Sequence, residues 1–134
     1  MGLIIIFWTL VYCLSTAFSI VLLGDRNLIS GNLLSIDAIL KLLFNWKFIS
    51  AMALAIFSRI SFIFLNNSFL KVPRLAAIST TLTTFATVIS LIFIVLANYF
   101  FLQEKLNTQQ LIGGIIILIG ISIITRLDFR LPKV

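Results

Sequence analysis

The fold of this chain is constrained most by four apolar runs, at residues 3–23, 48–65, 75–101 and 109–125. A helix needs about 20 mostly apolar residues to cross a bilayer, and each run reaches or approaches that length with its flanks. Helices satisfy their own backbone hydrogen bonds in lipid. The sequence therefore predicts an all-α integral membrane protein, a single domain of four transmembrane helices.

Composition supports a membrane protein and excludes several other classes. Only 10% of the 134 residues are charged, against about 25% in soluble domains. The net charge of +6 lies almost wholly between or after the apolar runs, where positive charge sets membrane orientation, so no nucleic-acid partner is expected. Histidine is absent and the four acids are scattered. We expect no metal, no cofactor, no catalytic residue and no enzymatic activity.

The connection at residues 24–47 carries a helical pattern of its own. Apolar side chains recur at helical spacing between residues 36 and 44, and Ser35 precedes them as a candidate N-cap. This pattern suits a short helix at the membrane interface, with Trp46 at headgroup depth. It suits an extended start of the second transmembrane helix equally well, and both alternatives stay open.

The basic residues divide almost evenly between the two membrane sides. Five against four only weakly favours a cytoplasmic C-terminus, so insertion in both orientations stays open. The first run is longer than a signal core and follows no basic residue, so we interpret it as a transmembrane helix. The two groups of basic residues are Lys71, Arg74, Arg126, Arg130 and Lys133, and Arg26, Lys41, Lys47 and Lys105.

A single cation, Arg59, interrupts the second apolar run near its middle. Such a cation is costly in lipid and usually faces a cavity, a partner or a ligand. The first run, residues 3–23, contains no acid. A transporter built from these helices therefore suits an anionic substrate better than a cationic one. The alternative is a structural pairing of Arg59 with backbone carbonyls or with a partner subunit.

Polar residues continue from Arg59 towards one membrane face, at Asn66, Asn67, Lys71 and Arg74. Together they form a candidate path that guides a phosphate from the interface inward. Lys71 and Arg74 also fit the role of ordinary loop charges that snorkel to lipid headgroups.

Hydroxyl side chains crowd the start of the third run. Thr80, Thr84 and Thr87 lie on one helix face by their spacing. They are candidate substrate-binding residues, as is Tyr12 in the first run. Hydroxyl residues also pack helices closely or bond to their own preceding turn, and packing is the favoured role for most of them.

Glycines mark the fourth run as a helix interface. Gly113 and Gly120 are seven residues apart and share one face, and Gly114 lies beside them. Small residues let helix backbones approach each other in lipid. We therefore predict an interface at these glycines, within the chain or between two chains.

Residues 38–125 resemble the drug/metabolite transporter superfamily. The resemblance rests on Asn-Asn-Ser-Phe-Leu-Lys-Val-Pro at 66–73, Phe-Phe-Leu-Gln-Glu-Lys-Leu-Asn at 100–107, and the glycine-bearing run that follows. In that superfamily an aromatic–Gly–Glu–Lys/Arg–Leu string precedes a glycine-bearing last helix. This chain lacks the glycine of that string.

Four spans in one short chain look like the small multidrug resistance branch, which forms antiparallel dimers through its last helix. Its efflux members use a glutamate in the first helix, whereas residues 11–15 contain no acid. Flippase subunits for aminoarabinose-linked undecaprenyl phosphate also lack that glutamate. The resemblance implies a flippase for a polyprenyl-phosphate-linked sugar or a similar anionic lipid.

The resemblance also implies where the protein works and with what. It implies the plasma membrane, which is the inner membrane of a bacterium. The expected partners are membrane lipids and either a second copy or a paralogous four-helix subunit. Two alternatives to a flippase stay open. The first is a small membrane interaction or regulatory protein without transport activity, and the second is a small multidrug-type transporter that exports cations.

Overall fold

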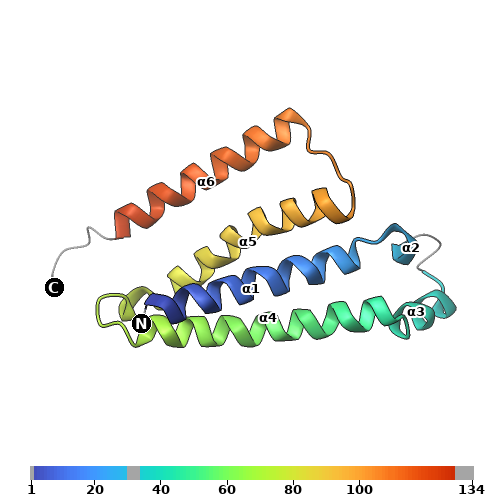
Figure 1. Ribbon diagram of the computed structural model, residues 1–134, viewed down its shortest axis with the longest axis horizontal. Helices are drawn as coiled ribbons and strands as arrows, with labels where there is room; N and C mark the ends of the chain where they lie inside the picture. Colours follow the sequence, from blue (N-terminus) through green and yellow to red (C-terminus); the bar gives the residue numbers. More distant parts are fainter. Residues whose placement is uncertain (1, 30–33, 129–134) are drawn as a thin grey trace. The chain divides into compact units, whose positions relative to one another are not determined.

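The computed structural model describes residues 2–29 and 34–128, and every regular element in those ranges is helical (Figure 1). Two helices fall in the connection after the first long helix, and a 3-10 turn precedes the third. In chain order the elements are α1 (Gly2–Leu23), α2 (Arg26–Ile29), α3 (Ile36–Leu43), α4 (Trp46–Leu70), η1 (Ala76–Ile78), α5 (Ser79–Phe101) and α6 (Thr108–Asp128).

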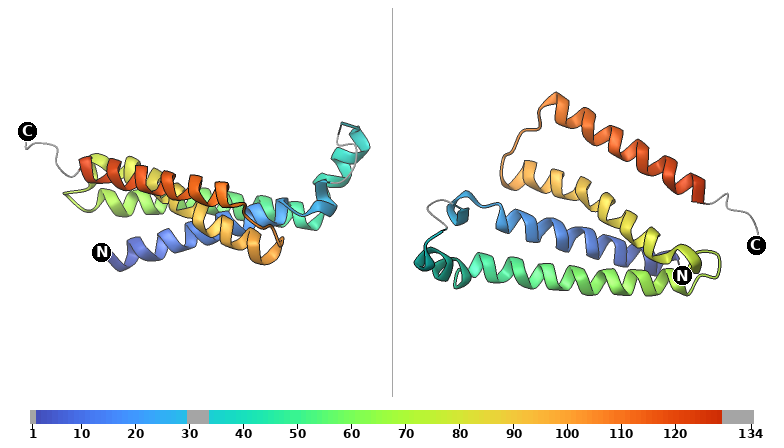
Figure 2. Two further views of the ribbon diagram at one scale, coloured as in Figure 1. Left: turned by 90° about the horizontal axis from the view of Figure 1, so that it is seen from above. Right: turned by 180° about the vertical axis from the view of Figure 1, so that it is seen from behind.

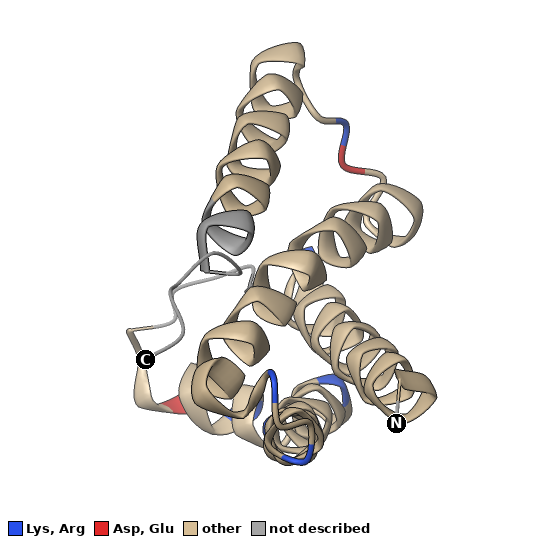
Figure 3. Cartoon of the chain, turned by 90° about the vertical axis from the view of Figure 1, so that its left-hand side faces the viewer, with Lys and Arg blue, Asp and Glu red and all other residues tan. Residues whose placement is uncertain are grey.

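The predicted fold class, an all-α membrane protein, is confirmed. Three segments are long and apolar enough to cross a membrane: α1, α4, and η1 with α5. The fourth apolar helix, α6, has 21 residues, of which the apolar stretch Thr108–Ile123 is shorter than the other three. In Figure 3 the helices are mostly tan, with few blue or red segments, because few of their residues are charged.

The chain divides into two compact units, and the division falls between Gln103 and Glu104. In the first unit α1 contacts both α4 and α5, and α4 and α5 also contact each other (Figure 1 and Figure 2). Because α1 and α5 run antiparallel to α4, the N-terminal end of α1 lies at the same end of the unit as the α4–α5 turn. The second unit consists of α6 and the loop before it.

Most buried side chains of the first unit are small, and the large ones among them are Tyr12 and Leu65. Close packing of small residues is the usual way helices associate in lipid, where apolar surface alone gives no driving force. Leu65 and Cys13 are fully buried, and Ser19 Oγ donates to the Ala51 carbonyl, 2.8 Å away on α4. The other small buried residues are Ser15, Ala17, Ser58, Ser61, Ser68, Ser79, Thr83, Ala86 and Ser90.

The helix predicted in the first connection exists and is separate from the second span. Ser35 caps α3 by accepting from the Ala38 amide, and Asn45 caps α4 by accepting from the Lys47 amide at 2.9 Å. Two caps ten residues apart mark two helix starts. The alternative of an extended start to the second span is therefore wrong. An ion pair between Lys47 and Asp25 ties the end of α1 to the start of α4.

Other observed boundaries refine the predicted ones. The second span is longer than residues 48–65, because Asn66–Leu70 continue α4 in helical conformation. At the end of the loop before α6, the Asn107 backbone amide donates to the Gln110 side-chain oxygen at 3.0 Å. After α5, Gln103 adopts a φ of 54°, the left-handed conformation that often ends a helix and favours glycine.

Candidate functional site

Arg59 lies near the middle of α4. At 1.5 Å rise per residue it is about 20 Å from Trp46 and about 17 Å from Leu70 along the helix axis. The hydrocarbon core of a bilayer is about 30 Å thick. If α4 spans the membrane, Arg59 therefore sits close to the midplane, the depth at which a cation costs most.

The Arg59 side chain faces outward from the α1–α5 unit. It is exposed, and its outward neighbours Ile56 and Ile63 are 60% and 66% exposed. The opposite face of α4, with Ser61 and Ser68, is buried. Arg59 makes no hydrogen bond or ion pair with any described residue. Its charge therefore has no protein partner in the described chain.

Asn66 lies on the same side of α4 as Arg59. Seven residues at 100° each place the two side chains within about 20° around the helix axis. Asn66 Oδ1 is 3.5 Å from Thr83 Oγ1 on α5, while the Thr83 hydroxyl donates to the Ser79 carbonyl at 2.8 Å. A hydroxyl has one hydrogen, so the shorter bond takes it. The Asn66 amide group therefore retains free hydrogen-bonding capacity towards α5.

The other predicted residues of this path lie between Asn66 and the α4–α5 turn. Asn67 is exposed. Lys71 is the C-cap of α4, and its amide donates to the Asn67 carbonyl at 3.3 Å. Arg74 lies in the turn itself and is also exposed. These residues lead from the end of α4 towards Arg59, in the order that the sequence predicts.

Tyr12 is part of the core. It is 2% exposed, its hydroxyl lies 3.1 Å from Thr87 Oγ1, and its ring meets Phe62 edge-on at 5.9 Å between centroids. A single side chain thereby joins α1, α4 and α5. Because the Tyr12 hydroxyl contacts Thr87, a substrate could bind the Tyr12 hydroxyl only by displacing that contact.

The hydroxyl residues of α5 divide between two faces. Thr80, Thr84 and Thr87 are exposed, and Thr84 donates to the Thr80 carbonyl at 2.9 Å. Ser79 and Thr83 are buried against the other helices, as is Ser90. The three threonines of the predicted stripe are thus exposed, but the Thr87 hydroxyl also contacts the core at Tyr12, and Ser79, Thr83 and Ser90 pack against the other helices.

Asn98 was not singled out by its sequence position. Its side-chain oxygen is buried and has no hydrogen-bond partner among the described residues. Buried amide oxygens normally accept a hydrogen bond. The sequence signal that could have drawn attention to Asn98 is that it is an amide residue within the otherwise apolar second half of α5.

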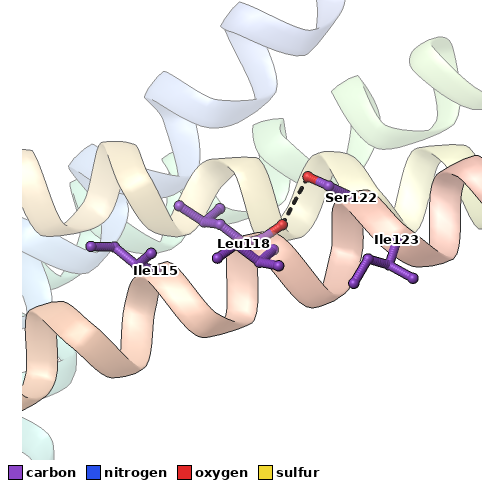
Figure 4. A pocket seen from close by; sticks show the side chains of 5 residues that line it. Ile115, Leu118, Ser122 and Ile123 are labelled. Carbon is purple, nitrogen blue, oxygen red and sulfur yellow. Dashed lines mark hydrogen bonds between the residues drawn. The ribbon is translucent and has the colours of Figure 1, made fainter.

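Gly113 and Gly120 lie on one face of α6, and Gly114 lies beside that face. Within the unit that α6 forms, a Cβ added at Gly113, Gly114 or Gly120 would meet no atom within 4 Å. Elsewhere on α6 is a shallow apolar depression, where Ser122 donates to the Leu118 carbonyl at 2.9 Å (Figure 4). The depression belongs to one helix and is an open surface rather than an enclosed site. Its lining residues are Ile115, Leu118, Ile119, Ser122 and Ile123.

The surface charges near α3 have a structural explanation. A hydrogen bond from Lys47 holds the pKa of the Asp25 carboxyl below its usual value, and the Asn27 amide adds to this effect.

Over the described ranges, no three histidine, cysteine or acidic side chains lie close enough together to hold a metal ion.

No protein-family model matches this chain, and neither curated proteins nor solved structures give a match. The resemblance to the drug/metabolite transporter superfamily therefore stays a prediction. The long apolar helices by themselves identify a membrane protein.

Proposed function

We propose that this protein is a non-enzymatic subunit of a membrane transporter or flippase. Its cargo is an anionic amphiphile of the class of polyprenyl-phosphate-linked sugars. The headgroup passes along the outward face of α4 while the lipid tail stays in the bilayer. The proposal places the protein in the plasma membrane, the inner membrane of a bacterium.

One observation carries this proposal: the outward-facing Arg59 lacks a partner in the described chain. Arginine at the centre of a membrane helix costs about 2.5–3.5 kcal/mol on insertion scales. A phosphate recovers part of that cost, because a hydrogen bond between charged groups contributes about 1.5–3 kcal/mol. The planar guanidinium also matches two phosphate oxygens at once.

The architecture supports a subunit that works with a second one. Small side chains close the core of the α1–α5 unit, so its polar groups that remain open face outward. An outward polar surface in lipid needs a second surface to enclose a headgroup. We propose that a second copy or a paralogous four-helix subunit supplies it, held partly through the Gly113 and Gly120 face of α6.

An interaction protein without transport activity is the second candidate. The same unpaired Arg59 would bind an acidic residue in the transmembrane helix of another protein, because intramembrane charges pair with one another. The two candidates differ in water access. Transport requires Arg59 to meet water and headgroup, whereas a protein partner would cover it permanently.

The test is lipid movement in proteoliposomes. The purified protein is reconstituted with a trace of a polyprenyl-phosphate sugar that carries a fluorescent headgroup, and an impermeant quencher is added outside. Wild type should speed the loss of the protected inner signal, and Arg59→Gln should not. A folded wild type that leaves the inner signal as protected as in empty liposomes would contradict the proposal. Ile63→Leu, on the same outward face, is the matched control.

A further inference from the structure

Polar residues are distributed unevenly along α4. Towards its C-cap Lys71, the polar residues of α4 that stay exposed or half-buried are Arg59, Asn66 and Asn67, while Ser58, Ser61 and Ser68 are buried against the other helices. Its other half, residues 46–57, is apolar apart from Lys47 at the start and Ser50. The outward polar surface of α4 therefore runs from one end of the helix to its middle and stops there.

The same asymmetry appears on α5, at the same end of the unit. Seven hydroxyl residues lie in the first half of the helix, residues 79–90, whereas the second half, residues 91–101, has Asn98 and Tyr99 as its polar side chains. Because α4 and α5 are joined by a short turn, the first half of α5 lies beside the second half of α4. The contact between Asn66 and Thr83 confirms this pairing.

We infer that water and anionic headgroups reach Arg59 from one side of the membrane only, the side of the α4–α5 turn. The route of entry is the polar strip, which we define as Arg59, Asn66, Asn67, Thr80 and Thr84. The other half of the unit is sealed towards Arg59 by apolar side chains. The entry of anionic headgroups rests on the proposed function. The entry of water from one side does not depend on that function.

The strip can be hydrated at low cost. Asn67, Thr80 and Thr84 are exposed and offer amide and hydroxyl groups to water. Charged side chains in membrane helices are tolerated because water enters beside them and the bilayer thins locally. At the mouth, Lys71 and Arg74 are both exposed. Two cations at one membrane face raise the local concentration of anions there.

The outward residues in the apolar half of α4 have no side-chain groups that can hydrogen-bond to water. Its outward residues Met52, Ile56 and Phe57 are 43%, 60% and 46% exposed. In a bilayer these side chains face lipid tails. Along α4, a headgroup leaving Arg59 on that side would meet only the half-buried Ser50, about 14 Å away, before Lys47, about 18 Å along the helix axis.

Two positions on α4 make a matched test. Ile56 and Ile63 lie on the same outward face, on opposite sides of Arg59, and are similarly exposed at 60% and 66%. Single cysteines are introduced as Ile56→Cys and Ile63→Cys in a Cys13→Ala background. Cys13 itself is fully buried, so its removal takes away a competing thiol.

The reagent is an impermeant anionic methanethiosulfonate, applied to sealed proteoliposomes. We expect Ile63→Cys to react at least about tenfold faster than Ile56→Cys, which corresponds to a difference of about 1.4 kcal/mol in access. The ratio is taken over the molecules whose α4–α5 turn faces outward, the fraction that labelling of Lys71→Cys reports. Lys71→Cys serves as the marker for the turn side, and elution profiles show that each variant folds.

Equal rates at the two positions, or a faster reaction at Ile56→Cys, would overturn the inference. A second arm separates it from the proposed function. Added polyprenyl phosphate should slow the reaction of Ile63→Cys and leave that of Lys71→Cys less affected. If the unequal rates persist without any protection by the lipid, the one-sided hydration holds and the proposed function fails.

Discussion

Replacing Arg59 by leucine should make the protein easier to insert and no less stable. The described chain offers Arg59 no hydrogen bond or ion pair, so the substitution breaks none. The outward neighbours of Arg59 are apolar. A leucine at this position therefore continues an apolar surface that already faces lipid.

The magnitude follows from the depth of Arg59. At a helix centre, arginine costs about 2.5–3.5 kcal/mol on the insertion scale, and leucine contributes about −0.3 to −0.6 kcal/mol. The apparent free energy of inserting residues 46–70 should therefore fall by about 3–4 kcal/mol in Arg59→Leu. Glycosylation mapping of this segment in microsomes measures that quantity directly.

Unfolding of the full-length chain in bilayers completes the assay. Arg59→Leu should be at least as stable as wild type, and Ile63→Leu should lie within about 0.5 kcal/mol of it, as surface substitutions do. Leu65→Ala, at a fully buried position, should cost about 2–5 kcal/mol and so shows that the assay detects damage. A destabilised Arg59→Leu would mean that Arg59 has a structural partner, and the reasoning here would fail.

Three further predictions concern stability. Gln103→Gly should stabilise the chain by about 0.5–1 kcal/mol in an unfolding titration. The φ of Gln103 is 54°, and this left-handed conformation costs most residues about 1–2 kcal/mol. Glycine avoids that cost, but its greater conformational freedom in the unfolded chain offsets part of the gain. Since the pKa of Asp25 is lowered in the folded state, its ion pair with Lys47 should stabilise above about pH 4 and be lost as the pH falls through the folded pKa; a pH titration of Asp25→Asn should lack that loss. Tyr12→Phe should cost about 0.5–1.5 kcal/mol for its bond to Thr87, and little in a Thr87→Val background, as a double-mutant cycle measures.

The sequence predicted those elements whose signals are local. Ser35 was predicted as the cap of the helix in the first connection, and it caps α3 in the structure. Asn45 caps α4 in the same way, although it was not predicted as a cap. Arg59 stood out because a cation in an apolar run is costly wherever it points. Gln103 carried no such signal, since a positive φ at a residue other than glycine is set by how the chain leaves α5.

The direction in which each helix faces could not be predicted in the same way. The long helices are apolar on all sides, so hydrophobic periodicity does not mark a buried face. The buried face is marked by small residues such as Ser58, Ser61 and Ser68, because lipid tails solvate large apolar side chains as well as a protein core does. For the same reason the sequence did not reveal that Thr83 packs while Thr84 stays open.

The central claim is that Arg59 binds an anionic headgroup, and lipid binding to purified variants tests it most directly. The measurement is the dissociation constant of a polyprenyl-phosphate analogue for wild type, Arg59→Ala, Arg59→Lys, Lys71→Ala and Arg74→Ala. A lost charged hydrogen bond of about 1–3 kcal/mol predicts roughly 5- to 150-fold weaker binding for Arg59→Ala. Arg59→Lys should recover part of the affinity, and the two surface variants should lose less. If Arg59→Ala elutes as a folded protein and binds like wild type, Arg59 does not hold the headgroup and the account is contradicted.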